Sequence, residues 1–160
     1  MRTHEYRATV TWTGNTDSGT TSYTSYGRDH EVRAPNRSPI LGSSDAAFRG
    51  DPSRYSPEDL LVAAVSACHM LWYLHLCASS GLTVAAYTDE AIGEMSEHSD
   101  GGGEFRLVTL RPRVELAAPG DLDLAQELQR RAHRLCFIAR SLNFEVICQP
   151  EVTIQASVGG

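Results

Sequence analysis

The sequence predicts an α+β fold in which two long helices pack on an antiparallel sheet, in the order β-β-β-α-β-β-α-β. Residues 57–80 form a long apolar stretch with helix-capping signals at both ends. A second stretch, after Asp121 or Asp123, repeats apolar residues every three or four positions, which is typical of an amphipathic helix. Strand-like segments lie on both sides of each stretch. The length of 160 residues predicts a single domain over residues 1–160.

The first helix has clear signals for its beginning and end. Ser56 is a good N-cap, and Pro57 suits the first helical position because its missing N–H costs nothing there. Glu58 and Asp59 place negative charge at the positive end of the helix dipole, and Gly81 supplies the stop. Apolar or small residues occupy almost every face, which predicts burial. The stretch is too short, and too often interrupted by His and Ser, to be a convincing membrane span.

The strands are predicted from alternating or β-branched residues. We expect strands over residues 5–13, 20–26 and 30–34, moderately β-prone sequence over 83–95, a long strand over 104–116, and a final strand over 145–154. Residues 35–55 are rich in Pro, Gly, Ser and Asp, and they predict a long loop that leads into the first helix. Within 104–116 the apolar positions change face, so we expect a bulge near Pro112.

Composition excludes several classes of protein. The net charge of −6 argues against nucleic acid as a partner, since phosphate binding needs a basic surface. The polar N-terminus does not resemble a signal peptide, and four cysteines are few for a disulfide-stapled secreted domain. We therefore expect a cytoplasmic protein that binds neither nucleic acid nor membrane. In a reducing cytosol, such cysteines are structural, metal-bound or catalytic.

The cysteines are the main candidates for chemistry. Cys68 lies in the middle of the first helix, and Cys136 lies near the end of the second. Packing is the ordinary role of a buried cysteine, and it is the role we assign to Cys77 and Cys148. The chain has no Cys-x-x-Cys and no His-x-x-x-His, so we expect no metal site. It also has no nucleophile elbow, dinucleotide-binding motif or P-loop.

The segment Ser-Pro-Glu-Asp-Leu-Leu-Val-Ala-Ala-Val-Ser-Ala-Cys-His-Met, residues 56–70, resembles the signature helix of the OsmC/Ohr family. That family covers osmotically inducible protein C and organic hydroperoxide resistance protein. Ala-His-Arg-Leu-Cys, residues 132–136, falls where the family carries its second cysteine. The sequence after Cys136 is Phe-Ile-Ala-Arg-Ser instead of the Pro-Val-Ser of better-known members, so the chain resembles a divergent branch.

This resemblance implies an OsmC-like fold and a thiol-dependent peroxidase. Cys68 would attack an organic hydroperoxide and become a sulfenic acid, and Cys136 would resolve it as a disulfide. No cofactor is implied, but an external dithiol or a lipoylated protein would act as reductant. The family activates its cysteine with an arginine held by the glutamate that corresponds to Glu58. Arg49 is the preferred candidate for that arginine, and Arg54 is the alternative.

The resemblance also implies an intertwined homodimer. Glu58 and Cys68 are ten residues apart, about 15 Å along a straight helix. Either the helix breaks near residues 63–66, or a second chain contributes to the site. We expect aromatic side chains to line an apolar substrate pocket, with Phe48, Trp72 and Phe137 as the main candidates and Tyr73 as another. Two alternatives to a peroxidase stay open: a non-catalytic binder of small apolar ligands, and a redox sensor.

Overall fold

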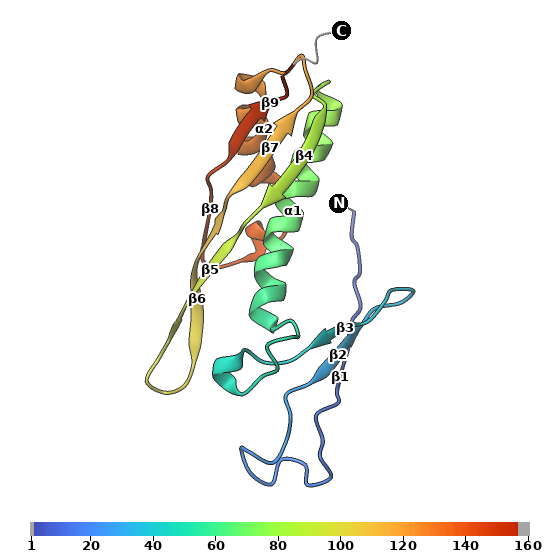
Figure 1. Ribbon diagram of the computed structural model, residues 1–160, viewed down its shortest axis with the longest axis vertical. Coiled ribbons are helices and arrows are strands. Elements are labelled where there is room, and N and C mark those ends of the chain that lie inside the picture. Colours follow the sequence, from blue (N-terminus) through green and yellow to red (C-terminus); the bar gives the residue numbers. More distant parts are fainter. Residues whose placement is uncertain (1, 157–160) are drawn as a thin grey trace. The chain divides into compact units, whose positions relative to one another are not determined.

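The computed structural model describes residues 2–156. The chain divides between Leu60 and Leu61 into two compact units. Figure 1 shows the elements in chain order.

The first unit holds a small antiparallel sheet. Its strands, in the order β1-β2-β3, are β1 (Thr9–Trp12), β2 (His30–Arg33) and β3 (Ile40–Gly42). The expected strands over 5–13 and 30–34 are therefore present, although the first is shorter. The predicted long loop over 35–55 contains β3 and a short 3-10 helix, η1 (Ala46–Phe48).

The strand predicted over residues 20–26 is wrong, because this segment forms bends and turns. Its hydroxyl groups form hydrogen bonds with nearby backbone groups, which are then not available to pair with a neighbouring strand. The Ser25 hydroxyl donates to the carbonyls of Gly19 at 2.8 Å and Ser22 at 2.9 Å. Local bonds of this kind compete with sheet pairing, so a segment rich in Ser and Thr can read as a strand and still fold as turns.

The first helix, α1 (Pro57–Ser79), agrees with the prediction. Ser56 and Asp59 form a capping box: Ser56 Oγ accepts from the Asp59 N–H at 3.1 Å, and Asp59 Oδ2 accepts from the Ser56 N–H at 2.9 Å. The ribbon of α1 is uninterrupted from one end to the other (Figure 1). The break considered near residues 63–66 is therefore absent.

The second unit combines two three-stranded sheets with a second helix. Its elements are β4 (Val84–Asp89), β5 (Ile92–Glu97), β6 (Gly103–Leu110), β7 (Pro112–Leu116), α2 (Leu122–Leu135), the 3-10 helix η2 (Ala139–Ser141), β8 (Glu145–Cys148) and β9 (Glu151–Ile154). The strand orders are β4-β7-β9 and β5-β6-β8. Pairs β4–β7 and β5–β6 are antiparallel, whereas β6–β8 and β7–β9 are parallel. The α+β fold class is confirmed, with parallel pairs that the predicted antiparallel sheet did not include.

Strands predicted as continuous are each divided in two. Arg111 separates β6 from β7, and residues 149–150 separate β8 from β9. The side chain of Asp89, at the end of β4, bonds to the residue between β6 and β7. Its Oδ1 accepts from the Arg111 N–H at 2.7 Å, and its Oδ2 accepts from Ser66 Oγ of α1 at 2.6 Å. The change of face expected near Pro112 is thus a break between two sheets, and Pro112 begins β7.

The helices pack on the strands through two apolar clusters. One cluster joins α1, α2 and β7, with Tyr73, Val114 and Leu128 among its members, and the other joins α1 to β6 through Val65 and Val108. Of the two predicted caps, Asp121 and Asp123, it is Asp121 that caps α2, where its side chain accepts from the Leu124 N–H at 2.9 Å.

The expected burial of α1 on every face is wrong within a single chain. Val65, His69 and Tyr73 are buried on one side, but Leu71 on another side is 62% exposed. By length and composition alone α1 could also span a membrane. However, the Ser66 hydroxyl and the His69 ring make hydrogen bonds to β4 and α2 of the same unit.

Candidate active site

Cys68 and Cys136 are neighbours in the second unit, although 67 residues separate them in the chain. Cys68 is half-buried in the middle of α1, and Cys136 is buried at the end of α2. Both are free thiols, and they are close enough for the Cys68 thiol to raise the pKa of Cys136. The structure therefore brings together the two cysteines that the sequence singled out.

Backbone groups position the Cys136 thiol. Cys136 is the C-cap of α2, where its N–H donates to the Ala132 carbonyl at 3.0 Å. Its Sγ accepts from the Ala139 N–H at 3.4 Å, which partly offsets the effect of burial. Burial is the larger effect, and together with the Cys68 thiol it raises the pKa of Cys136 to about 11. Cys136 is thus a neutral thiol at neutral pH.

An apolar groove of about 520 Å³ lies over Cys68. Apart from Cys68 itself, its walls come from one face of α1 and from the segment after Cys136: Ala64, Ala67, Leu71, Trp72, His75, Phe137 and Ile138. The Trp72 and Phe137 rings meet edge to face, with centroids 5.4 Å apart. Two of the three expected pocket residues therefore line the groove. Tyr73, by contrast, is fully buried in the core.

The arginine candidates both lie in the first unit and have different surroundings. Arg54 is half-buried and forms ion pairs with Asp29 at 3.4 Å and Asp51 at 3.5 Å. Arg49 is exposed and forms no ion pair among residues 2–156; its guanidinium lies 5.9 Å from the centre of the Tyr23 ring. Arg54 therefore has a structural role within its loop, whereas Arg49 is available for other contacts.

Phe48 and Glu58 also belong to the first unit. Phe48 ends η1 and is 39% exposed. Glu58 is half-buried in the first turn of α1, where its charge favours the helix dipole. Within the described part of the chain, the expected ion pair between Glu58 and Arg49 is not formed.

A buried polar cluster on the other side of α1 was missed by sequence reasoning. His69 is fully buried, and its Nε2 donates to Gln129 Oε1 of α2 at 2.7 Å. The same nitrogen is 3.5 Å from Cys148 Sγ of β8, so Cys148 has a polar neighbour beyond its packing role. Burial lowers the pKa of His69 and raises that of Cys148 to about 12, so both are neutral at neutral pH. The available signal was Gln129 itself, a polar residue beside Leu128 on the apolar side of α2.

Comparisons of the sequence and of the structure with known proteins point to the same family. A family model described as OsmC-like protein matches residues 50–151. An OsmC-like protein of unknown function from Vibrio cholerae is 32% identical, with 93% of this chain and 100% of that chain covered and a TM-score of 0.83. No curated protein matches the sequence.

More distant structures share the fold. An organic hydroperoxide resistance protein from Elizabethkingia anophelis is 18% identical, with 96% of this chain and 99% of that chain covered and a TM-score of 0.69. The organic hydroperoxide resistance protein OhrB of Bacillus subtilis is 22% identical, with 92% and 98% covered and a TM-score of 0.59. At these identities the likeness concerns the fold.

Proposed function

We propose, from the premise that this chain belongs to the OsmC-like protein family, that it is a thiol peroxidase that reduces organic hydroperoxides to alcohols. The observation that carries the proposal is the pair of neighbouring free thiols, Cys68 and Cys136, beneath an apolar groove. Cys68 is half-buried and Cys136 is buried, which suits a cycle in which Cys68 reacts with the substrate and Cys136 reacts only with Cys68.

The chemistry runs in two steps at these sulfurs. The Cys68 thiolate attacks the terminal oxygen of the hydroperoxide: an S–O bond forms, the O–O bond breaks, and the alkoxide leaves and takes a proton to become the alcohol. Cys136 then attacks the Cys68 sulfenic sulfur, so that an S–S bond forms and the S–O bond breaks. The departing hydroxide and the proton from Cys136 give water.

A reductant and a cation complete the cycle. An external dithiol, free or on a lipoylated protein, reduces the disulfide to two thiols and is itself oxidised to a disulfide, so no bound cofactor is needed.

Arg49 provides the cation that favours the Cys68 thiolate, and Glu58 orients Arg49 when the site is assembled. Because α1 is continuous, we propose that a second chain in a homodimer contributes to the site. Phe48 adds to the apolar wall formed by Trp72 and Phe137, which favours alkyl or aryl substrates over hydrogen peroxide. A reducing cytoplasm suits four free thiols.

Counting thiols after oxidation tests this function. The reduced chain has four free cysteines, and cumene hydroperoxide should remove two of them rapidly. Cys68→Ser should abolish the fast loss, whereas Cys77→Ala, a change in the buried core, should leave it intact. Thiols lost no faster than those of free cysteine would contradict the peroxidase and favour a binder of small apolar ligands. Oxidation without turnover under any dithiol would favour a redox sensor.

A further inference from the structure

We infer that Phe137 is a positioning residue that holds the Cys136 thiol beside Cys68 for disulfide formation. Phe137 follows Cys136 directly in the chain, and its side chain lines the groove over Cys68. This role rests on the proposed function, because it concerns the step in which Cys136 reacts with the Cys68 sulfenic acid. In that step the Cys136 thiol loses its proton, the S–S bond forms and the S–O bond of the sulfenic acid breaks. The Cys136 sulfur is oxidised, the Cys68 sulfur is reduced, and the hydroxide and the proton leave as water.

The segment over residues 136–142 is held together by its own hydrogen bonds. The Arg140 N–H donates to the Cys136 carbonyl at 3.1 Å, and the Ser141 hydroxyl donates to the Phe137 carbonyl at 2.8 Å. The Cys136 thiol belongs to the same set of bonds, since its sulfur accepts from a backbone N–H of this segment. A shift of Phe137 is therefore passed on to Cys136.

The same segment contacts α1 through apolar side chains. No backbone hydrogen bond among the described residues joins it to α1. Instead, the Phe137 and Trp72 rings meet with their centroids 5.4 Å apart and their planes at 79°, and Ile138 packs against the cluster that joins α1 to β6. Trp72 is four residues after Cys68, one turn along the same face of α1. The aromatic pair thus attaches the segment to α1 one turn away from Cys68.

Trp72 gives the Phe137 ring a fixed partner. The Trp72 side chain packs against the apolar cluster of α1, α2 and β7, and the His75 ring meets it edge to face with centroids 5.9 Å apart. Aromatic pairs of this geometry attract each other beyond the apolar area that they bury. Phe137 is 68% exposed, so its side chain contributes little to the core. Its contact with Trp72 therefore matters more for the position of the segment than for the stability of the fold.

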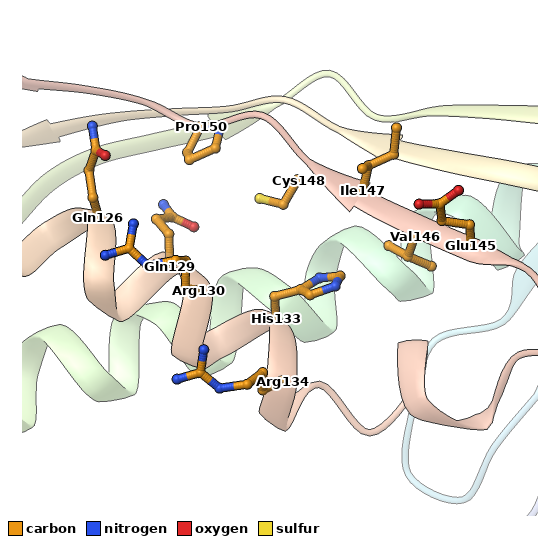
Figure 2. A pocket seen from close by; sticks show the side chains of 10 residues that line it. All are labelled: Gln126, Gln129, Arg130, His133, Arg134, Glu145, Val146, Ile147, Cys148 and Pro150. Atoms are coloured by element: carbon orange, nitrogen blue, oxygen red, sulfur yellow. The ribbon is translucent and has the colours of Figure 1, made fainter.

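The side of α2 that faces β8 gives the end of this helix little support. His133 and Arg134, in the last turn of α2, line a cavity of about 550 Å³. Figure 2 shows α2 on one side of this cavity and Val146 and Cys148 of β8 on the other. Space that no side chain fills supplies no packing contacts. The end of α2, where Cys136 lies, therefore depends mainly on its contacts with α1.

Equilibration of the full-length protein in a glutathione redox buffer tests this role without a hydroperoxide. The S–S bond between Cys68 and Cys136 forms, the S–S bond of oxidised glutathione breaks, and the two protons go to the two glutathione thiols. Peptide mapping by mass spectrometry gives the ratio of disulfide to dithiol. Phe137→Ala should lower this ratio about three- to tenfold, because the two thiols meet less often. Phe137→Tyr keeps the ring and should restore the wild-type ratio.

Two further variants provide controls. In a Trp72→Leu background, Phe137→Ala should cause little additional change, since the ring contact is already lost. Leu122→Ala shortens an exposed apolar side chain of α2 that does not line the groove, and it should leave the ratio unchanged. An unchanged ratio in Phe137→Ala would overturn the positioning role. An equal fall in Phe137→Tyr, or the full fall again in the Trp72→Leu background, would also overturn it.

A hydroperoxide experiment separates this role from the proposed function. After a pulse of tert-butyl hydroperoxide, dimedone trapping should show that the Cys68 sulfenic acid lives about three- to tenfold longer in Phe137→Ala than in the wild-type chain. A wild-type chain that forms no sulfenic acid would contradict the peroxidase, and the glutathione ratio would still decide the role of Phe137. Equal lifetimes in the two chains would overturn the role of Phe137 and leave the peroxidase standing.

Discussion

At the scale of single residues, the two arginines that the sequence left as alternatives have different surroundings. Arg54 is held by Asp29 and Asp51, whereas Arg49 is unpaired among the described residues. Arg49→Gln should slow the reaction of Cys68 with cumene hydroperoxide by about 10- to 100-fold, because the thiolate loses a charge-assisted partner. Rapid-mixing kinetics of thiol oxidation measures this rate.

Arg54→Gln is the matched control. It should leave that rate close to the wild-type value but lower the free energy of unfolding slightly, through the loss of two partly exposed ion pairs. Urea denaturation measures this second effect. A slow reaction in a stably folded Arg54→Gln variant would transfer the activating role from Arg49 to Arg54.

At the scale of elements, the end of α2 determines the surroundings of the Cys136 thiol. Burial and the neighbouring Cys68 thiol raise the pKa of Cys136, so only a small fraction of this thiol is ionised at pH 7, and that fraction increases as the pH rises. The Cys68 sulfenic acid should therefore be resolved faster as the pH rises from about 7 to 9. Trapping of the sulfenic acid with dimedone after a single hydroperoxide pulse measures its lifetime.

In Cys136→Ala the sulfenic acid should persist, and its lifetime should lose most of this pH dependence. A lifetime in the wild-type chain that stays constant across the same pH range would show that the Cys136 thiolate is not the resolving group.

At the scale of the whole molecule, the apolar face of α1 predicts a dimer. Leu71 is 62% exposed within one chain and lies in the groove over Cys68. Large exposed apolar surface of this kind is typical of an interface, and a second copy of the chain is the partner that we propose. Sedimentation at about 10 μM should give twice the mass of the chain, and Leu71→Arg should shift it towards the monomer.

Leu122→Arg provides the control, since Leu122 is a 44% exposed leucine at the beginning of α2 and does not line the groove. This variant should stay dimeric. A wild-type chain that sediments as a monomer at this concentration would contradict the dimer and also the contribution of a second chain to the Cys68 site.

The two helices and the importance of two cysteines follow from the sequence by itself. Ser56 and Asp121 cap the helices through hydrogen bonds to residues three positions away, and apolar periodicity marks their length. Such signals act within a few residues, so they can be recognised in the sequence. The resemblance of residues 56–70 and 132–136 to the sequence pattern of a known family then indicated Cys68 and Cys136.

Tertiary structure alone decided the rest. The strand breaks at Arg111 and residues 149–150, the parallel pairs, the exposed side of α1 and the His69–Gln129 hydrogen bond all depend on groups far apart in the chain. His69 and Gln129 are 60 residues apart, and no local pattern relates them. Periodicity shows which residues prefer burial, but the hydrogen-bond partner of a buried polar group and the neighbour of a strand are decided only when distant elements pack together.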